Sequence, residues 1–154
     1  MGASIAIGAP FPDYQVETPE GTYISLSELL KGAKTALVLI VGEWNPYCQA
    51  QMTDLVFHKD EIEEQAGGRV VVLSVDAPEK MTQFKEQMGF DFPVYSDQRW
   101  QGLQVGGLKD SEDNLYNPSV FVCDAEGVVR WFKIGKHYAD RASYKEIMEA
   151  LAAA

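Results

Sequence analysis

A chain of 154 residues is long enough for one domain with one hydrophobic core, and its 46% hydrophobic and 23% charged residues exclude a disordered chain. The net charge of −10 argues against binding to nucleic acid or to an anionic membrane surface. Two cysteines are too few for a disulfide scaffold, and the two histidines have no ligand spacing around them, so we expect neither a metal site nor a cofactor. The N-terminus has no signal-peptide core and no apolar run reaches membrane-spanning length, so we expect a cytoplasmic protein.

The first predicted elements are a hairpin and a short helix. Residues 14–26 contain a Pro-Glu-Gly turn signal between two short strands. Ser25 or Ser27 is expected to cap a helix that ends near Gly32. The apolar run at 35–41 then predicts a central strand that is covered on both faces.

Helices and strands alternate through the middle of the chain. A long helix is predicted at 46–65, followed by a second buried strand at 69–75. A helix at 77–88 opens with proline near its first turn and closes at a glycine. The short run at 92–95 is typical of an edge strand, and 98–106 is expected to be helical or irregular.

The last part of the chain predicts an antiparallel hairpin and a closing helix. Residues 119–123 and 128–134 are strands joined by a turn at 124–127, and the helix covers 143–153. The order of all these elements predicts an α/β fold with a mixed central sheet and helices on both faces.

Four stretches match motifs that occur together in one superfamily, in the same order along the chain. They are residues 8–14, the turn Trp44-Asn45-Pro46-Tyr47-Cys48, residues 74–79 and residues 117–127. Together they resemble the thioredoxin superfamily, specifically its redoxin branch of alkyl hydroperoxide reductase/thiol-specific antioxidant (AhpC/TSA) proteins and related thiol-disulfide oxidoreductases. The resemblance implies one thioredoxin-like domain over residues 1–154 with an N-terminal hairpin extension. It also implies that Pro118 is a cis proline that faces the turn at 44–48.

The turn at 44–48 resembles the W-C-x-x-C active-site turn of dithiol enzymes. Asn45 is a good N-cap and Pro46 suits the first helical position, so Cys48 falls in the first helical turn. The positive end of a helix favours a thiolate there. However, Asn45 occupies the position of the attacking cysteine, and Cys48 occupies that of the resolving one. Ordinary dithiol exchange, which needs both thiols, is therefore not expected.

Peroxiredoxins, with the pattern P-x-x-x-T-x-x-C, place their peroxide-reacting cysteine where Cys48 lies. This chain has Val41 at the place of the proline, Asn45 at that of the threonine and Pro118 at that of the activating arginine. These three departures argue against peroxidase activity. Cys123 lies five residues beyond Pro118 along a strand, roughly 16 Å away, so it is expected to be a core residue rather than a partner for Cys48.

Three functions remain open from the sequence. The leading hypothesis is a redoxin-like thiol oxidoreductase or antioxidant protein that acts on a peroxide or on a protein or small-molecule thiol or disulfide. Its sole redox thiol would be Cys48, in a pocket formed by Trp44, Asn45, Pro46, Tyr47 and Pro118. A second hypothesis is a non-catalytic module that docks a partner on the face of Trp44, Tyr47 and Pro118. A third is a first-cysteine variant of a dithiol oxidoreductase, because only Asn45 departs from the Cys-Pro-Tyr-Cys turn of glutaredoxins.

Overall fold

The computed structural model describes residues 5–40, 46–98, 118–136 and 139–154, and seven strands in this part form one sheet. The strands are β1 (Gln15–Glu17), β2 (Tyr23–Ser25), β3 (Thr35–Ile40), β4 (Arg69–Ser74), β5 (Val94–Ser96), β6 (Ser119–Cys123) and β7 (Val129–Ile134). The helices are α1 (Leu26–Leu29), α2 (Pro46–Phe57), a π-helical turn η1 (Glu61–Gln65), α3 (Pro78–Met88) and α4 (Tyr144–Ala153). Of the predicted segment 98–106, all but the first residue lies outside the described residues.

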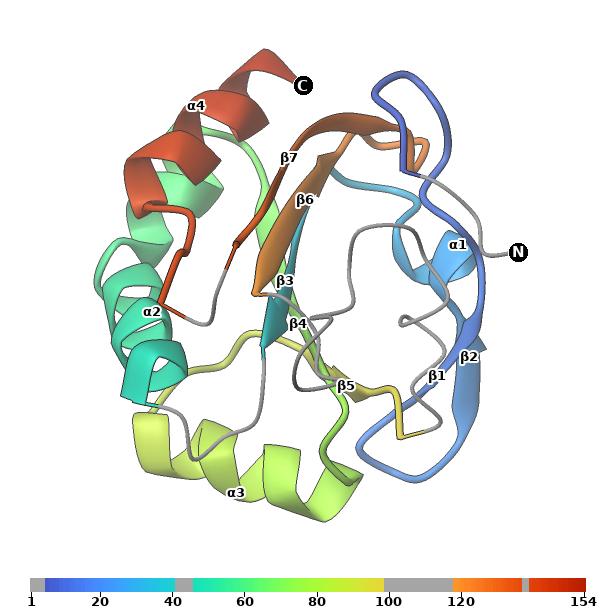
Figure 1. Cartoon of the computed structure of the whole chain (residues 1–154), viewed down its shortest axis with the longest axis vertical. Helices are drawn as coiled ribbons and strands as arrows, with labels where there is room; N and C mark the ends of the chain where they lie inside the picture. Colours follow the sequence, from blue (N-terminus) through green and yellow to red (C-terminus); the bar gives the residue numbers. More distant parts are fainter. Residues whose placement is uncertain (1–4, 41–45, 99–117, 137–138) are drawn as a thin grey trace.

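The sheet is mixed, with the strand order β2-β1-β5-β4-β3-β6-β7. Strands β3, β4 and β5 are parallel neighbours, whereas β6, β7 and the N-terminal hairpin pair antiparallel. Right-handed crossovers between the parallel strands place α2 and α3 on the same face. Figure 1 shows α2, α3 and α4 along one side of the sheet and α1 on the other. The predicted mixed sheet with helices on both faces is therefore confirmed.

The core is centred on β3. All six of its residues are buried, and it pairs with β4 on one side and β6 on the other. On the neighbouring strand β6, the Phe121 ring lies 5.0 Å from the Phe11 ring and 5.9 Å from the Phe132 ring, measured between centroids. Because β3 is enclosed on all sides, its ends are the fixed points from which the neighbouring loops start.

The N-terminal hairpin forms as predicted and changes the place of β5. Strand β1 pairs with β2 around a turn in which Gly21 has a φ of +85°. On its other side, β1 joins β5 through the pair Glu17 and Ser96. The prediction of an edge strand at 92–95 was therefore wrong: β5 lies inside the sheet, because a segment distant in sequence covers its outer side.

Helix α1 is capped by a residue that the sequence did not indicate. Ser25 is the N-cap residue, but its side chain makes no capping hydrogen bond. Instead, the carboxylate of Asp13 accepts hydrogen bonds from the Ser27 backbone N–H at 3.0 Å and from the Ser25 hydroxyl at 2.9 Å. These hydrogen bonds outweigh the opposing effect of burial and lower the pKa of Asp13.

The long helix predicted at 46–65 is interrupted. Helix α2 ends at Phe57, and the segment continues as the π-helical turn η1. At the junction the His58 ring stacks on Tyr144 of α4, with 3.4 Å between centroids, and Ile62 remains fully buried. A π-helical turn, which is wider than an α-helical one, accommodates both contacts. The spacing of apolar residues in the sequence does not reveal this widening.

The β6–β7 hairpin is held by the carboxylate of Asp124. It accepts hydrogen bonds from the backbone N–H groups of Glu126 at 3.0 Å and Val128 at 3.1 Å, and from Arg130 Nε at 2.8 Å. Burial opposes ionisation, but these hydrogen bonds outweigh it and hold the pKa of Asp124 below its usual value. The turn is therefore stabilised by the ionised form of Asp124.

We predict that Asp124→Ala lowers the free energy of unfolding by about 1–2 kcal/mol, since two backbone donors lose a charged acceptor. The difference from wild type is present at neutral pH and is lost as the pH falls through the lowered pKa of Asp124, because protonation removes the same acceptor. Urea unfolding at several pH values measures it. Glu126→Gln, which removes a carboxylate from the same turn, is the control, and an equal loss in that variant would contradict the prediction.

Candidate active site

The candidate site lies where α2 begins, next to the carboxyl end of β3. Pro46 and Tyr47 are exposed, and the Tyr47 side chain is 46% accessible to solvent. Cys48, the third residue of α2, is fully buried. The other two residues predicted for this turn, Trp44 and Asn45, lie outside the described residues, as does Val41.

Two opposing influences act on the Cys48 thiol. It belongs to the buried core, where loss of solvation disfavours a thiolate. It also lies in the first turn of a 12-residue helix, where the backbone N–H groups and the helix dipole favour negative charge. A further positive group nearby would therefore strengthen its reactivity.

The structure brings such a group to the same face of α2. Gln51 lies one turn beyond Cys48 and is also buried. Its Oε1 accepts a hydrogen bond from Nη1 of Arg141 at 3.0 Å. Residues three apart on a helix share a face, so the Arg141 guanidinium reaches the side of α2 that carries Cys48. Figure 1 shows the segment before α4 running beside α2.

Neither Gln51 nor Arg141 was identified from the sequence. Gln51 offered a weak signal, as a polar residue one turn from Cys48 beside the inward-facing Met52 and Leu55. Arg141 offered none, because it lies 90 residues from Gln51 in a polar segment before α4.

Pro118 is brought to this region by the sheet register. Leu39 pairs with Ser119, so Pro118 lies beside the end of β3 from which the chain leads to α2. It is buried, and its carbonyl accepts a hydrogen bond from the Gly135 N–H at 2.8 Å. The peptide bond predicted to be cis joins Pro118 to residue 117, which is not among the described residues.

Cys123 lies at the opposite end of the sheet. It pairs with Thr35, the first residue of β3, whereas α2 follows the last one, Ile40. Five strand positions correspond to roughly 16 Å, and disulfide formation requires Cα atoms within about 7 Å. Burial, together with the neighbouring Asp124 carboxylate, raises the pKa of Cys123 to about 12. Cys123 is therefore a core residue, and it is not placed to resolve an oxidised Cys48.

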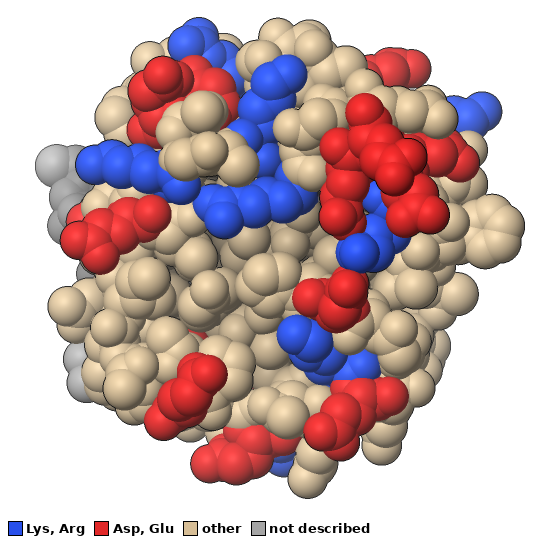
Figure 2. Space-filling view, turned by 180° about the vertical axis from the view of Figure 1, so that it is seen from behind, with Lys and Arg blue, Asp and Glu red and all other residues tan. Residues whose placement is uncertain are grey.

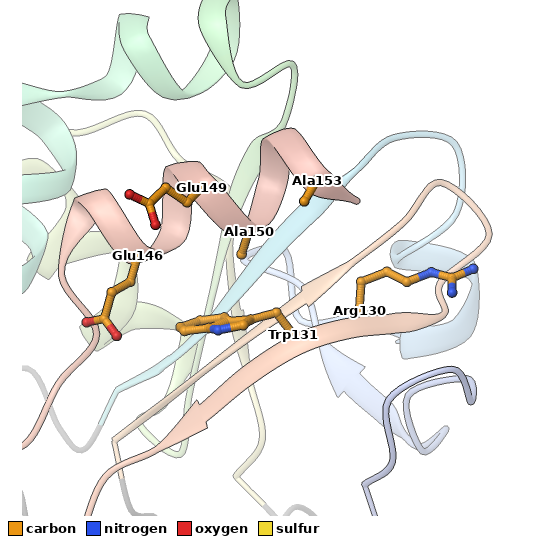
Figure 3. Close-up of a pocket in the computed structure, with 6 residues that line it drawn as sticks. All are labelled: Arg130, Trp131, Glu146, Glu149, Ala150 and Ala153. Atoms are coloured by element: carbon orange, nitrogen blue, oxygen red, sulfur yellow. The ribbon is translucent and has the colours of Figure 1, made fainter.

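A separate hollow of about 480 Å³ lies between β7 and α4. Figure 3 shows the Trp131 indole beneath Ala150, with Glu146 and Glu149 at one end and Arg130 at the other. The described residues that line it do not include Cys48, Gln51 or Arg141. Charges of both signs therefore surround this hollow, and it is distinct from the candidate site.

Other kinds of site find little support in the described residues. No group of three or more His, Cys, Asp or Glu side chains among them could hold a metal ion. None of the helices within these ranges has the length and apolar character to cross a membrane. Figure 2 shows basic side chains in a band on the upper part of one face, with acidic side chains on both sides of it. In a chain with a net charge of −10, this band is a poor match for a polyanion.

Comparison with known proteins identifies the fold and the family. Peroxiredoxin Bcp of Escherichia coli is 25% identical over 138 residues, covering 82% of this chain and 86% of its own. The crystal structure of peroxidoxin BcpB from Mycobacterium tuberculosis superposes with a TM-score of 0.79 at 23% identity over 97% of both chains. Reduced Prx3 from Vibrio vulnificus, solved with hydrogen peroxide, gives a TM-score of 0.82 at 18% identity and covers 96% of this chain and 99% of its own.

The thioredoxin-like fold expected from the resemblance is thus confirmed. The family model of the AhpC/TSA family matches residues 7–132, which include β1 to β6 and the candidate site at the start of α2. The chain belongs to the AhpC/TSA family.

Proposed function

We propose that the protein is a thiol peroxidase that uses Cys48 as its single redox thiol. The observation that carries this proposal is the buried Cys48 in the first turn of α2, with the Gln51–Arg141 hydrogen bond one turn away. The pocket predicted from Trp44, Asn45, Pro46, Tyr47 and Pro118 is part of the proposal. So are a single domain over residues 1–154 and a cytoplasmic location.

The chemistry requires one thiolate and one peroxide. The Cys48 sulfur attacks the nearer peroxide oxygen, the O–O bond breaks, and a proton converts the departing oxygen into water or an alcohol. Cys48 becomes a sulfenic acid, oxidised by two electrons. The distant Cys123 cannot reduce it, so an external thiol forms a mixed disulfide with release of water. A second external thiol then frees Cys48.

The burial of Cys48 favours a small substrate. Cys48 is fully buried, so hydrogen peroxide or a short alkyl hydroperoxide requires a much smaller opening to meet its sulfur than a protein disulfide does. Among the structural neighbours, Prx3 was solved with hydrogen peroxide. Peroxide is therefore the proposed substrate class, ahead of protein disulfides.

Arg141 can compensate for one departure from the peroxiredoxin pattern, the absence of an arginine at position 118. Pro118 stands at the place of the activating arginine and cannot supply a positive charge. The positively charged Arg141 guanidinium contacts α2 through Gln51 instead. We propose that it favours the Cys48 thiolate and the negative charge that develops on the departing oxygen.

We predict that Cys48→Ser abolishes peroxide consumption in the presence of dithiothreitol, whereas Cys123→Ser retains it. The wild-type protein should also form a Cys48 sulfenic acid that peptide mass spectrometry detects after trapping. Wild-type protein that leaves peroxide unconsumed while still binding a partner through Tyr47 would support the non-catalytic module instead.

We predict that an alkylating reagent labels Cys48 faster than Cys123 in the folded protein, because the start of α2 favours the Cys48 thiolate although both side chains are buried. With a pKa of about 12, Cys123 remains a buried thiol at mildly alkaline pH. Peptide mass spectrometry before and after denaturation measures the two sites separately. Faster labelling of Cys123 than of Cys48 in the folded state would contradict the assignment.

We predict that Arg141→Ala slows the reaction of Cys48 with hydrogen peroxide about tenfold at neutral pH, equivalent to a rise of about one unit in the thiol pKa. The difference should narrow at alkaline pH, where Cys48 ionises in both proteins. Lys145→Ala, which removes an exposed cation from the adjacent helix α4, is the matched control. An equal loss in that control, or a loss independent of pH, would show that Arg141 does not act on the thiol.

A further inference from the structure

Gly135, directly after β7, is enclosed by backbone from two other segments. A Cβ atom at this position would lie 2.1 Å from the carbonyl oxygen of Asp140 and 3.0 Å from that of Pro118. A contact of 2.1 Å is far below van der Waals distance, and the atoms involved are main chain rather than a flexible side chain. Any residue other than glycine would therefore displace Asp140.

The requirement at Gly135 is for space and not for an unusual backbone angle. Gly21, Gly67 and Gly127, for example, have positive φ values of 71° to 85°. Gly135 lies outside that region of φ. Its lack of a side chain serves the close approach of the segment around Asp140 to the end of β7.

Side-chain contacts hold the Asp140 segment at this point. The Asp140 carboxylate accepts a hydrogen bond from the Lys136 N–H at 2.9 Å and forms an ion pair with Lys133 Nζ at 3.5 Å. The same Lys133 Nζ lies 3.5 Å from the carbonyl oxygen of Arg141. The main chain is thus fixed against β7 immediately before the Arg141 side chain extends to Gln51.

We propose that Gly135 is a positioning residue for the Cys48 site. By admitting the Asp140 carbonyl, it sets the point from which Arg141 reaches α2. It also accounts for the convergence of Pro118 and the Arg141 segment, because the Gly135 N–H donates to the Pro118 carbonyl at 2.8 Å. The proposal rests on the proposed function, in which Cys48 is the reactive thiol.

The test is Gly135→Ala, with the Cys48 thiolate titrated by its ultraviolet absorbance against a Cys48→Ser reference. We expect the titration midpoint to rise by about one unit and the rate with hydrogen peroxide to fall at least tenfold, since a displacement of about 1 Å in a site can cost about 10²-fold. The titration needs no peroxide. Wild-type protein that does not react with peroxide would therefore refute the proposed function, while the titration would still test Gly135.

A matched control separates positioning from loss of stability. Gly68→Ala also forces a contact, at 2.6 Å from the side chain of Leu151 on α4, but away from Arg141. It should lower the melting temperature without moving the Cys48 titration. If Gly135→Ala behaves in the same way, the proposal is overturned.

A double-mutant cycle tests the route through Arg141. In an Arg141→Ala background, Gly135→Ala should produce no further shift in the titration, and a full additive shift would overturn the proposal. If Gly135→Ala does not fold, Asp140→Ala loosens the same segment without overfilling it and should shift the titration in the same direction. An unchanged titration in that variant would equally overturn the proposal.

Discussion

The complete enclosure of β3 is the constraint on which the rest of the structure depends. Every residue of this strand is buried, and it pairs with β4 on one side and β6 on the other. Its register with β6 places Pro118 at its carboxyl end and Cys123 at its amino end. This register separates the two cysteines, so Cys123 cannot serve as the second thiol that Asn45 leaves missing from the turn.

Much of the fold could be predicted because local rules and tertiary structure agree. Apolar runs identified β3 and β4, and proline and glycine marked the ends of α3. The errors concern elements whose form depends on distant residues. Strand β5 became internal because β1 covers it, and the helix after Phe57 widened where His58 meets Tyr144. Sequence period cannot show either contact, because each joins segments far apart along the chain.

The residues of the candidate site also fall into two groups, those with a local sequence signal and those that depend on contacts between distant segments. Cys48 could be predicted because the start of a helix is a local signal, written in the residues just before it. Arg141 and Gly135 could not, since their importance arises from a side chain that crosses to α2 and from a missing side chain that admits another backbone. An arginine before a helix and a glycine after a strand are ordinary residues in sequence. They acquire a role only because the segment around Asp140 packs against the end of β7.

The difference between local signals and distant contacts also matters for the chain's departures from the peroxiredoxin pattern. A motif records the residues that most members use to favour a thiolate, but the physical requirement is positive charge and hydrogen-bond donors near the sulfur. Burial makes that requirement stronger for Cys48, because an unassisted thiolate is costly in an apolar core. In the proposed function, the Arg141 guanidinium, which donates to Gln51 of α2, supplies this positive charge from a different element than Pro118. On this proposal, the chain keeps the chemistry without the pattern's arginine, provided that the end of β7 holds Arg141 in place.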